Sequence, residues 1–225
     1  QRAYLADSAY QQGRMTAFVS MSSSKGFESL IKRAEELAEE HMPDGVEVRP
    51  AGYLPLYVQM MDYVVESQVT SFAAAFLVIF VLMGVLFRSL RVAAISILPN
   101  MLPVFAMLGL MGLAGITLDV ATVTITAIVL GIAVDDTIHY MYRYRKELRA
   151  SGGDYEQAAL RTAVRAGPAI AGTTLLLCIG FLVLIGATVK SVFFFGLLSS
   201  FAFAVALVGD LVVLPALLAV LRPKI

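Results

Sequence analysis

Asp135 and Asp136 are consecutive carboxylates in a stretch, residues 120–142, whose only other ionisable group apart from tyrosine is His139. Two adjacent carboxylates in a medium of low dielectric constant cannot both ionise cheaply, so such a pair is suited to taking up and releasing a proton. At helical spacing, Gly131, Asp135 and His139 share one face, and Asp136 points about 100° away from it. His139 is then either a proton relay or a fixed hydrogen-bond partner.

Four more polar residues lie inside other apolar stretches. With about 1.5 Å of rise per residue, the acidic pair lies about 10 Å, and Asp210 about 16 Å, from the basic end of its stretch. On the same scale Asn100 lies about 13 Å in, and Thr173 and Thr174 about 11 Å. Charged groups cost several kcal/mol in hydrocarbon, and they therefore face a bundle interior or a wet cavity. The similar depths predict one shared internal polar site.

Each of these four residues also has a structural interpretation. Asn100 stands between two prolines, where its side chain would satisfy carbonyls freed in a broken helix. Thr173 and Thr174 would bond back to their own helix, as threonines in membrane helices often do. Asp210 would fix the packing of two helices instead of joining a relay.

The surrounding sequence is too apolar for a soluble protein. It is 59% hydrophobic and only 15% charged, where soluble domains have about 25% charged residues. A bilayer core needs about 20 apolar residues per helix. Five stretches satisfy this length: residues 67–87, 92–118, 120–142, 166–189 and 191–221. The predicted fold class is an α-helical polytopic membrane protein with five transmembrane helices over residues 67–225.

The charges in the connections predict the orientation. Ten Lys and Arg lie in the first and third connections and at the C-terminal end, whereas the two opposite connections contain only Lys190. By the positive-inside rule the basic side is cytoplasmic, so residues 1–66 lie outside the cell (inner) membrane and the C-terminus lies inside. The pattern of residues 154–164 is compatible with a short helix along the cytoplasmic surface, and we interpret this stretch as an ordinary amphipathic connector.

Residues 1–66 are more polar, and their pattern predicts a small α+β extracytoplasmic segment. A strand is expected at residues 14–21, an amphipathic helix at 27–41 and a second strand at 46–49. Such a unit is too small to fold well alone, which indicates part of a larger domain. Because the chain begins at Gln1 on a polar stretch without an initiator methionine, we expect a fragment of a longer protein.

Composition also excludes some classes of function. A formal net charge of zero gives no basic footprint for nucleic acid. The single cysteine, Cys178, excludes an internal disulfide, and neither histidine is followed by metal-ligand spacing. We therefore expect no metal and no nucleic-acid partner.

The acidic helix also resembles a known family. Residues 131–139 (GIAVDDTIH) and 142–145 (YRYR) resemble the resistance–nodulation–division superfamily, and more narrowly its lipid-exporter-like branch of MMPL and hopanoid-transporter relatives. Three further stretches fit: residues 98–103 (LPNMLP), 172–174 (GTT) and 209–216 (GDLVVLPA). The resemblance covers about residues 55–222.

The resemblance implies an architecture and an activity. Members have two repeats, each with one helix, a large extracytoplasmic porter-like domain and five more helices; this chain resembles the end of the second repeat, with residues 1–66 from the porter-like domain. The implied function is proton-driven export of a hydrophobic or amphiphilic, lipid-like molecule, with Asp135, Asp136 and His139 carrying the proton. Either aspartate would serve as the carrier. Implied partners are the N-terminal repeat, membrane lipids and the small-molecule substrate, and the resemblance is compatible with a homo-oligomer. Protons are the implied coupling ion, and no cofactor is implied. The protein is not expected to be an enzyme.

Two other functions compete with this hypothesis. A sterol-sensing-domain-like regulator shares the five-helix architecture but binds lipid without pumping, and it needs no titratable pair at this depth. An intramembrane aspartyl protease would use Asp136 and Asp210 as a dyad that shares a proton. Flanking protease motifs are absent from the sequence, which disfavours the protease.

Overall fold

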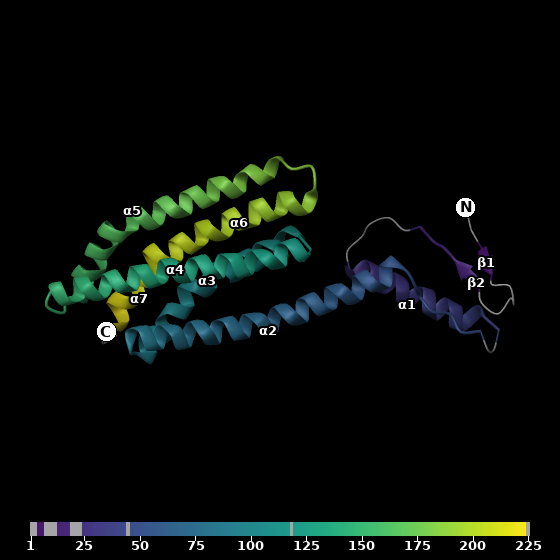
Figure 1. The fold of residues 1–225 in the computed structure, drawn as a ribbon, viewed down its shortest axis with the longest axis horizontal. Coiled ribbons are helices and arrows are strands. Elements are labelled where there is room, and N and C mark those ends of the chain that lie inside the picture. Colours follow the sequence, from purple (N-terminus) through teal and green to yellow (C-terminus); the bar gives the residue numbers. More distant parts are fainter. Residues whose placement is uncertain (1–3, 7–12, 19–23, 44–45, 118, 224–225) are drawn as a thin grey trace. The chain divides into compact units, whose positions relative to one another are not determined.

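The computed structural model describes residues 4–6, 13–18, 24–43, 46–117 and 119–223. It divides into two compact units, Gln1–Met61 and Asp62–Ile225. Helix α2 (Tyr53–Phe87) runs through the boundary between them. Figure 1 shows the helices and strands of the chain.

The first unit contains two three-residue strands and one helix before α2. Strands β1 (Tyr4–Ala6) and β2 (Gly13–Met15) pair antiparallel, and α1 (Ser24–His41) follows. Phe27 of α1 is buried and meets the ring of Tyr57 edge-on, with the ring centroids 6.1 Å apart. An aromatic contact therefore holds α1 against the first turns of α2.

The predicted helix at residues 27–41 is confirmed within α1, but the predicted α+β segment is not supported. Residues 46–49 form no strand, and the predicted strand at 14–21 coincides with β2 over only two residues; its residues 19–21 lie outside the described part. The side chains of Val46 and Val48 are exposed. An alternating pattern becomes a strand only where a neighbouring strand and a buried face support it, and the described residues supply neither next to 46–49.

The second unit confirms the five predicted spans. They are α2; α3 (Leu90–Ala114); α4 (Val120–Ala150); α5 (Tyr155–Leu182), which continues as the 3₁₀ turn η1 (Val183–Gly186); and a composite last span. The last span consists of α6 (Lys190–Val208), a single π-helical segment η2 (Gly209–Val213) and α7 (Leu214–Leu221) (Figure 1). Each span is long and apolar enough to cross a bilayer. The chain is therefore an integral membrane protein.

Side-chain caps fix where three of these helices begin. The side chain of Ser89 accepts from the N–H of Val92 at the start of α3. Asp119 and Thr122 form a reciprocal capping box at the start of α4. Asp154 accepts from the N–H of Gln157 at the start of α5.

Residues 155–164 form the first part of α5, which runs from Tyr155 to Leu182 with Pro168 inside it, and they are not a helix of their own. Ala158, Ala159 and Thr162 are buried on it, and the hydroxyl of Tyr140 on α4 donates to the carbonyl of Ala159. Packing against α4 therefore buries one side of this amphipathic stretch.

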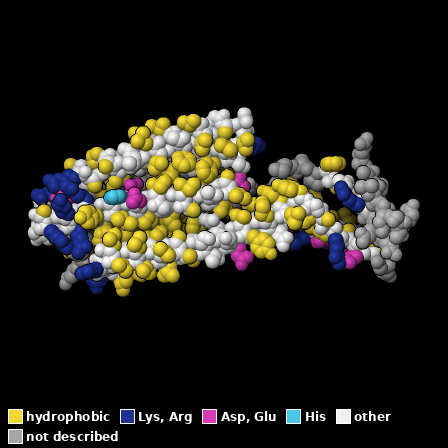
Figure 2. All heavy atoms as spheres, in the orientation of Figure 1, with side chains coloured by type: hydrophobic (Ala, Val, Ile, Leu, Met, Phe, Trp, Pro, Cys, Tyr) yellow, Lys and Arg dark blue, Asp and Glu magenta, His cyan; other side chains and the backbone are white. Residues whose placement is uncertain are grey.

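Two clusters of buried apolar residues form the core of the second unit. One gathers residues near the basic ends of the spans, among them Met83, Tyr140 and Leu214, and the other includes Met107, Val129 and Phe203. Figure 2 shows most of the Lys and Arg side chains of this unit gathered at one end of the helices. In α3, α4 and the last span, the buried polar residues Asn100, Thr137 and Asp210 each lie in the sequence between residues of one cluster and residues of the other.

Candidate functional site

The buried polar site centres on Thr137 of α4. Its hydroxyl oxygen lies 2.6 Å from Oδ1 of Asp210 and 3.2 Å from Oδ1 of Asn100. All three side chains are buried. Three separate helical spans therefore meet at one hydroxyl group.

Asn100 has a fixed orientation in this site. Its Nδ2 donates to the carbonyl of Ser96 on its own helix across 2.7 Å. Rotating the amide would place Oδ1 against that carbonyl, so Oδ1 must face Thr137. Ser96 is not one of the residues whose carbonyls Pro99 and Pro103 leave without an N–H donor, which are Ile95 and Pro99, so this bond is not the predicted one. The two ends of the Asn100 amide instead serve different helices.

Asp210 is carried by η2, where the π-helical segment lies against α3. A Cβ on Gly209 would lie only 2.9 Å from the carbonyl oxygen of Pro99, so only glycine fits this approach. Pro103 has no N–H to donate to that carbonyl, four residues back along α3. The prolines and the glycine therefore let the backbones of α3 and η2 come close, and π-helical turns often occur at functional sites.

The carboxyl group of Asp210 has few hydrogen-bond donors around it. The residue is 2% exposed, Thr137 bonds Oδ1, and the buried Oδ2 has no hydrogen-bond partner in the described part of the chain. Asp136 of α4 is half-buried and directly precedes Thr137, the residue that bonds Asp210. Asp136 is thus one position in the chain from the contact that joins α4 to Asp210.

Asp135 and His139 lie on a different face of α4. Their side chains are 70% and 72% exposed, and His139 Nε2 lies 3.7 Å from Asp135 Oδ1. Gly131, one turn away, is exposed as well, as the four-residue spacing predicts for a shared face. Figure 2 shows a histidine beside acidic side chains on the surface of this unit. The other spans of this chain leave that face open.

The two threonines of α5 do not join the site. Thr173 donates to carbonyls of Ala169 and Ile170, and Thr174 donates to Ile170. Both therefore bond within their own helix. The structure brings together Asn100, Asp210 and the neighbouring Asp136, and it leaves the threonine pair out.

The sequence family was identified by comparison with known proteins. The model of the MMPL family matches residues 13–224. The chain belongs to the MMPL family. Its relatives include a membrane protein of Methanocaldococcus jannaschii, 31% identical over 83% of this chain and 48% of that protein.

Two relatives of the MMPL chain carry names that describe transport. The hopanoid transporter HpnN of Burkholderia multivorans is 28% identical over 80% of this chain and 20% of its own length. The trehalose monomycolate exporter MmpL3 of Mycolicibacterium smegmatis is 28% identical over 81% of this chain and 18% of its own length. The MMPL chain spans less than half the length of each of these three relatives.

Sequence reasoning missed Thr137 as a member of the site in this MMPL chain. The buried face of α4 includes Thr126, Ala133, Thr137, Tyr140 and Tyr144, three to seven residues apart. Such spacing marks the packed face of a helix. The spacing of the packed face in residues 120–142 therefore indicates Thr137, before Asp135, as a buried member of the site.

Glu147 was missed as well. It lies beyond the predicted span at 120–142, yet it is buried and pairs with two arginines: Arg165 Nη1 at 2.7 Å and Arg143 Nε at 3.1 Å. The hydrogen bond from Arg165 is the main reason that the pKa of Glu147 lies below the ordinary glutamate value. This pair joins the ends of α4 and α5 in the MMPL chain and is structural.

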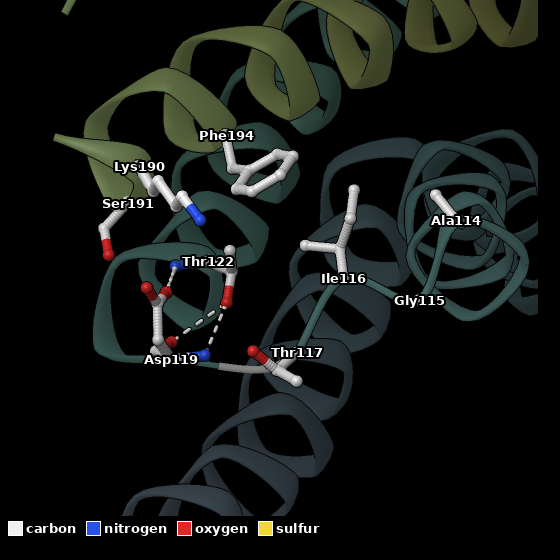
Figure 3. A pocket seen from close by; sticks show the side chains of 9 residues that line it. All are labelled: Ala114, Gly115, Ile116, Thr117, Asp119, Thr122, Lys190, Ser191 and Phe194. Atoms are coloured by element: carbon white, nitrogen blue, oxygen red, sulfur yellow. Dashed lines mark hydrogen bonds between the residues drawn. The ribbon is translucent and has the colours of Figure 1, made fainter. Parts of the chain in front are cut away.

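A pocket lies at the opposite end, between the α3–α4 connection and the start of α6. Figure 3 shows Lys190, Ser191 and Phe194 on one side and Thr117, Asp119 and Thr122 on the other, with the Lys190 ammonium directed inward. Asp119 and Thr122 are engaged in the cap of α4. Among the described residues, no group of three or more His, Cys, Asp or Glu could hold a metal ion.

Proposed function

We propose that this chain is part of a transporter that exports a hydrophobic or amphiphilic, lipid-like molecule, driven by protons that enter through the acidic site of α4. The observation that supports it is the open face of α4. Asp135 and His139 lie within a candidate membrane span, and their side chains are 70% and 72% exposed.

An open charged face is costly in a membrane. Charged side chains in spans face a bundle interior or a water-filled cavity, because hydrocarbon solvates them poorly. The proposed cover is the N-terminal repeat of the same transporter, and a water-filled path between the two repeats would bring protons to Asp135 and His139. A second copy of the chain is the other candidate cover.

The burial of the acidic groups suggests a direction for the proton. Asp135 is exposed, Asp136 is half-buried, and Asp210 is buried and bonded to Thr137, the residue that follows Asp136. A proton taken up at the open face would pass to Asp136 and be sensed at Asp210. A series of carboxyl groups of increasing burial is suited to linking proton uptake to a change in helix packing.

The substrate class is taken from the names of the relatives. HpnN is named as a hopanoid transporter and MmpL3 as a trehalose monomycolate exporter, and we extend a lipid-like substrate to this chain. In the proposed topology residues 1–66 belong to an extracytoplasmic porter-like domain, and the basic end of the spans faces the cytoplasm across the inner membrane. Transport requires no enzymatic step.

The test is an export and proton-flux assay on the complete transporter reconstituted in vesicles. Asp135→Asn and Asp136→Asn each remove one carboxylate while keeping the size of the side chain. We expect at least one of the two variants to lose substrate-dependent proton flux and export together. Wild-type flux and export in both variants would overturn the proposal.

A matched control and a competing function complete the design. Asp154→Asn removes a carboxylate from the cap of α5, where asparagine caps equally well, and it should leave transport unchanged. A sterol-sensing-domain-like regulator would bind lipid in the same vesicles but move neither lipid nor protons. Binding without flux in the wild-type protein would therefore favour the regulator.

A further inference from the structure

We propose that Thr137 is a proton-linked switch residue, whose hydroxyl donates to Asp210 when that carboxyl is ionised and to Asn100 when it is protonated. As a coupling device the switch rests on the proposed proton-driven function, but the switch itself is a property of these three residues. Its basis is the pair of distances at the Thr137 hydroxyl, 2.6 Å to Asp210 Oδ1 and 3.2 Å to Asn100 Oδ1.

The hydroxyl of Thr137 has one proton but two acceptor oxygens within reach. If Asp210 is ionised, the proton goes to Asp210, and Oδ1 of Asn100 loses its donor. If Asp210 carries a proton, its own O–H donates to Thr137, and the Thr137 proton goes to Asn100. Only the protonated arrangement satisfies both contacts of Thr137 at once.

The fixed orientation of Asn100 limits the number of hydrogen bonds that the site can form. Its Nδ2 is already bonded to the carbonyl of Ser96 at 2.7 Å, so the amide cannot turn to offer Thr137 a donor. An ionised Asp210 would accept a single hydrogen bond in the described structure, from Thr137, with Oδ2 buried and unpaired. A buried carboxylate with so few donors is costly.

Thr137 also differs from four other threonines of the spans. The hydroxyls of Thr124, Thr162, Thr173 and Thr174 bond to carbonyls of their own helix. This is the usual arrangement for a threonine inside a helix. The Thr137 hydroxyl instead lies against two other spans, so reversing its hydrogen bond changes the link between α3 and η2.

The charged groups around Asp210 leave Asp136 as the neighbour that influences the switch. Asp210 lies in η2, which packs against α3, α4, α6 and α7, and Leu211 of η2 also lies beside Gly167 of α5. On α4, Asp136 directly precedes Thr137, whereas Asp135 and His139 lie on the exposed face. The charged residues of α5 nearest to Gly167 are Arg165, which pairs with Glu147, and Arg161, which is exposed. The charged residue of α3 is Arg91, in its first turn, that of α6 is its first residue Lys190, and α7 has none. Proton uptake at Asp136 would therefore be felt at Asp210.

The test is pH-difference infrared spectroscopy of the complete transporter in membranes. The C=O stretching band of protonated Asp210 is identified as the band that is lost in Asp210→Asn. We expect Thr137→Val to shift this band to higher frequency, because the acid loses its acceptor, and Thr137→Ser to keep it in place. Thr162→Val, which removes a buried hydroxyl bonded within its own helix, is the matched control and should leave the band unmoved.

Asn100→Leu tests the second half of the switch and replaces Thr137→Val if that variant does not assemble. Without the acceptor at Asn100, the protonated arrangement loses one hydrogen bond, so the Asp210 band should appear only at lower pH than in the wild type. An unmoved band in Thr137→Val, or an unchanged pH of appearance in Asn100→Leu, would overturn the switch. Because the bands are measured without substrate, a working switch in a protein that shows no proton-driven export would refute only the proposed function.

Discussion

The hydroxyl of Thr137 on α4 lies 2.6 Å from Oδ1 of Asp210, 73 residues later in the chain. This contact places the carboxyl of the last span against the helix that also carries Asp135 and Asp136. The π-helical segment at Gly209–Val213 and the glycine–proline approach of η2 to α3 hold Asp210 in that position. The helix that carries the acidic pair is thereby linked to α3 and the last span.

Gly209→Ala should weaken the site by forcing η2 away from α3. The new Cβ would lie 2.9 Å from the Pro99 carbonyl oxygen, a backbone atom that cannot turn aside. We expect a loss of about 1–3 kcal/mol of stability, as for overpacked interiors. Thermal unfolding in detergent, followed by circular dichroism, measures it.

Gly180→Ala is the matched control for that substitution. A Cβ on Gly180 of α5 would meet nothing within 4 Å, and alanine favours a helix by about 0.5–1 kcal/mol over glycine. The control should therefore unfold at the same temperature as the wild type or slightly higher. Equal destabilisation in both variants would show that the approach of η2 to Pro99 is unimportant.

Glu147→Gln should destabilise the basic ends of α4 and α5 in a pH-dependent way. Because the pKa of Glu147 is lowered from 4.5 in the folded chain, its ionised form contributes stability above pH 4.5, and this contribution is lost as the pH falls through the folded value. The unfolding temperature of the variant should lie below that of the wild type at neutral pH. The difference should shrink as the solution is acidified.

Glu156→Gln provides the comparison for Glu147. Glu156 also pairs with an arginine, Arg222, at 3.5 Å, but its side chain is 76% exposed. Exposed pairs contribute little to stability. If Glu156→Gln lowered the unfolding temperature as much as Glu147→Gln at neutral pH, the burial of Glu147 would have no energetic consequence.

The proposed topology predicts opposite labelling of two exposed lysines. In a Cys178→Ala background, Lys190→Cys should react with a membrane-impermeant thiol reagent added outside intact cells. Lys146→Cys should react only after the membrane is opened. Labelling of Lys146→Cys in intact cells, with Lys190→Cys protected, would show that the orientation is the opposite of the proposed one. Repeating the labelling in spheroplasts excludes the possibility that an outer envelope blocks the reagent.

The sequence alone determined the five spans, because the length and apolarity of a stretch are properties of the chain that a bilayer selects directly. It also determined that an acidic pair lies within one span, and its motif indicated the family. The helix at 27–41 followed from apolar spacing. The strand predicted at 46–49 is not formed, because a strand requires a neighbouring strand to pair with.

Only the tertiary structure decided which polar residues meet. Asp135 and Thr137 are two positions apart, yet one faces outward from these helices and the other is buried, because helix packing selects the face. The contact of Thr137 with Asp210 and that of Glu147 with Arg165 join separate helices. Such contacts depend on the rotation and closeness of whole helices, which the side chains along all of their packed faces set together.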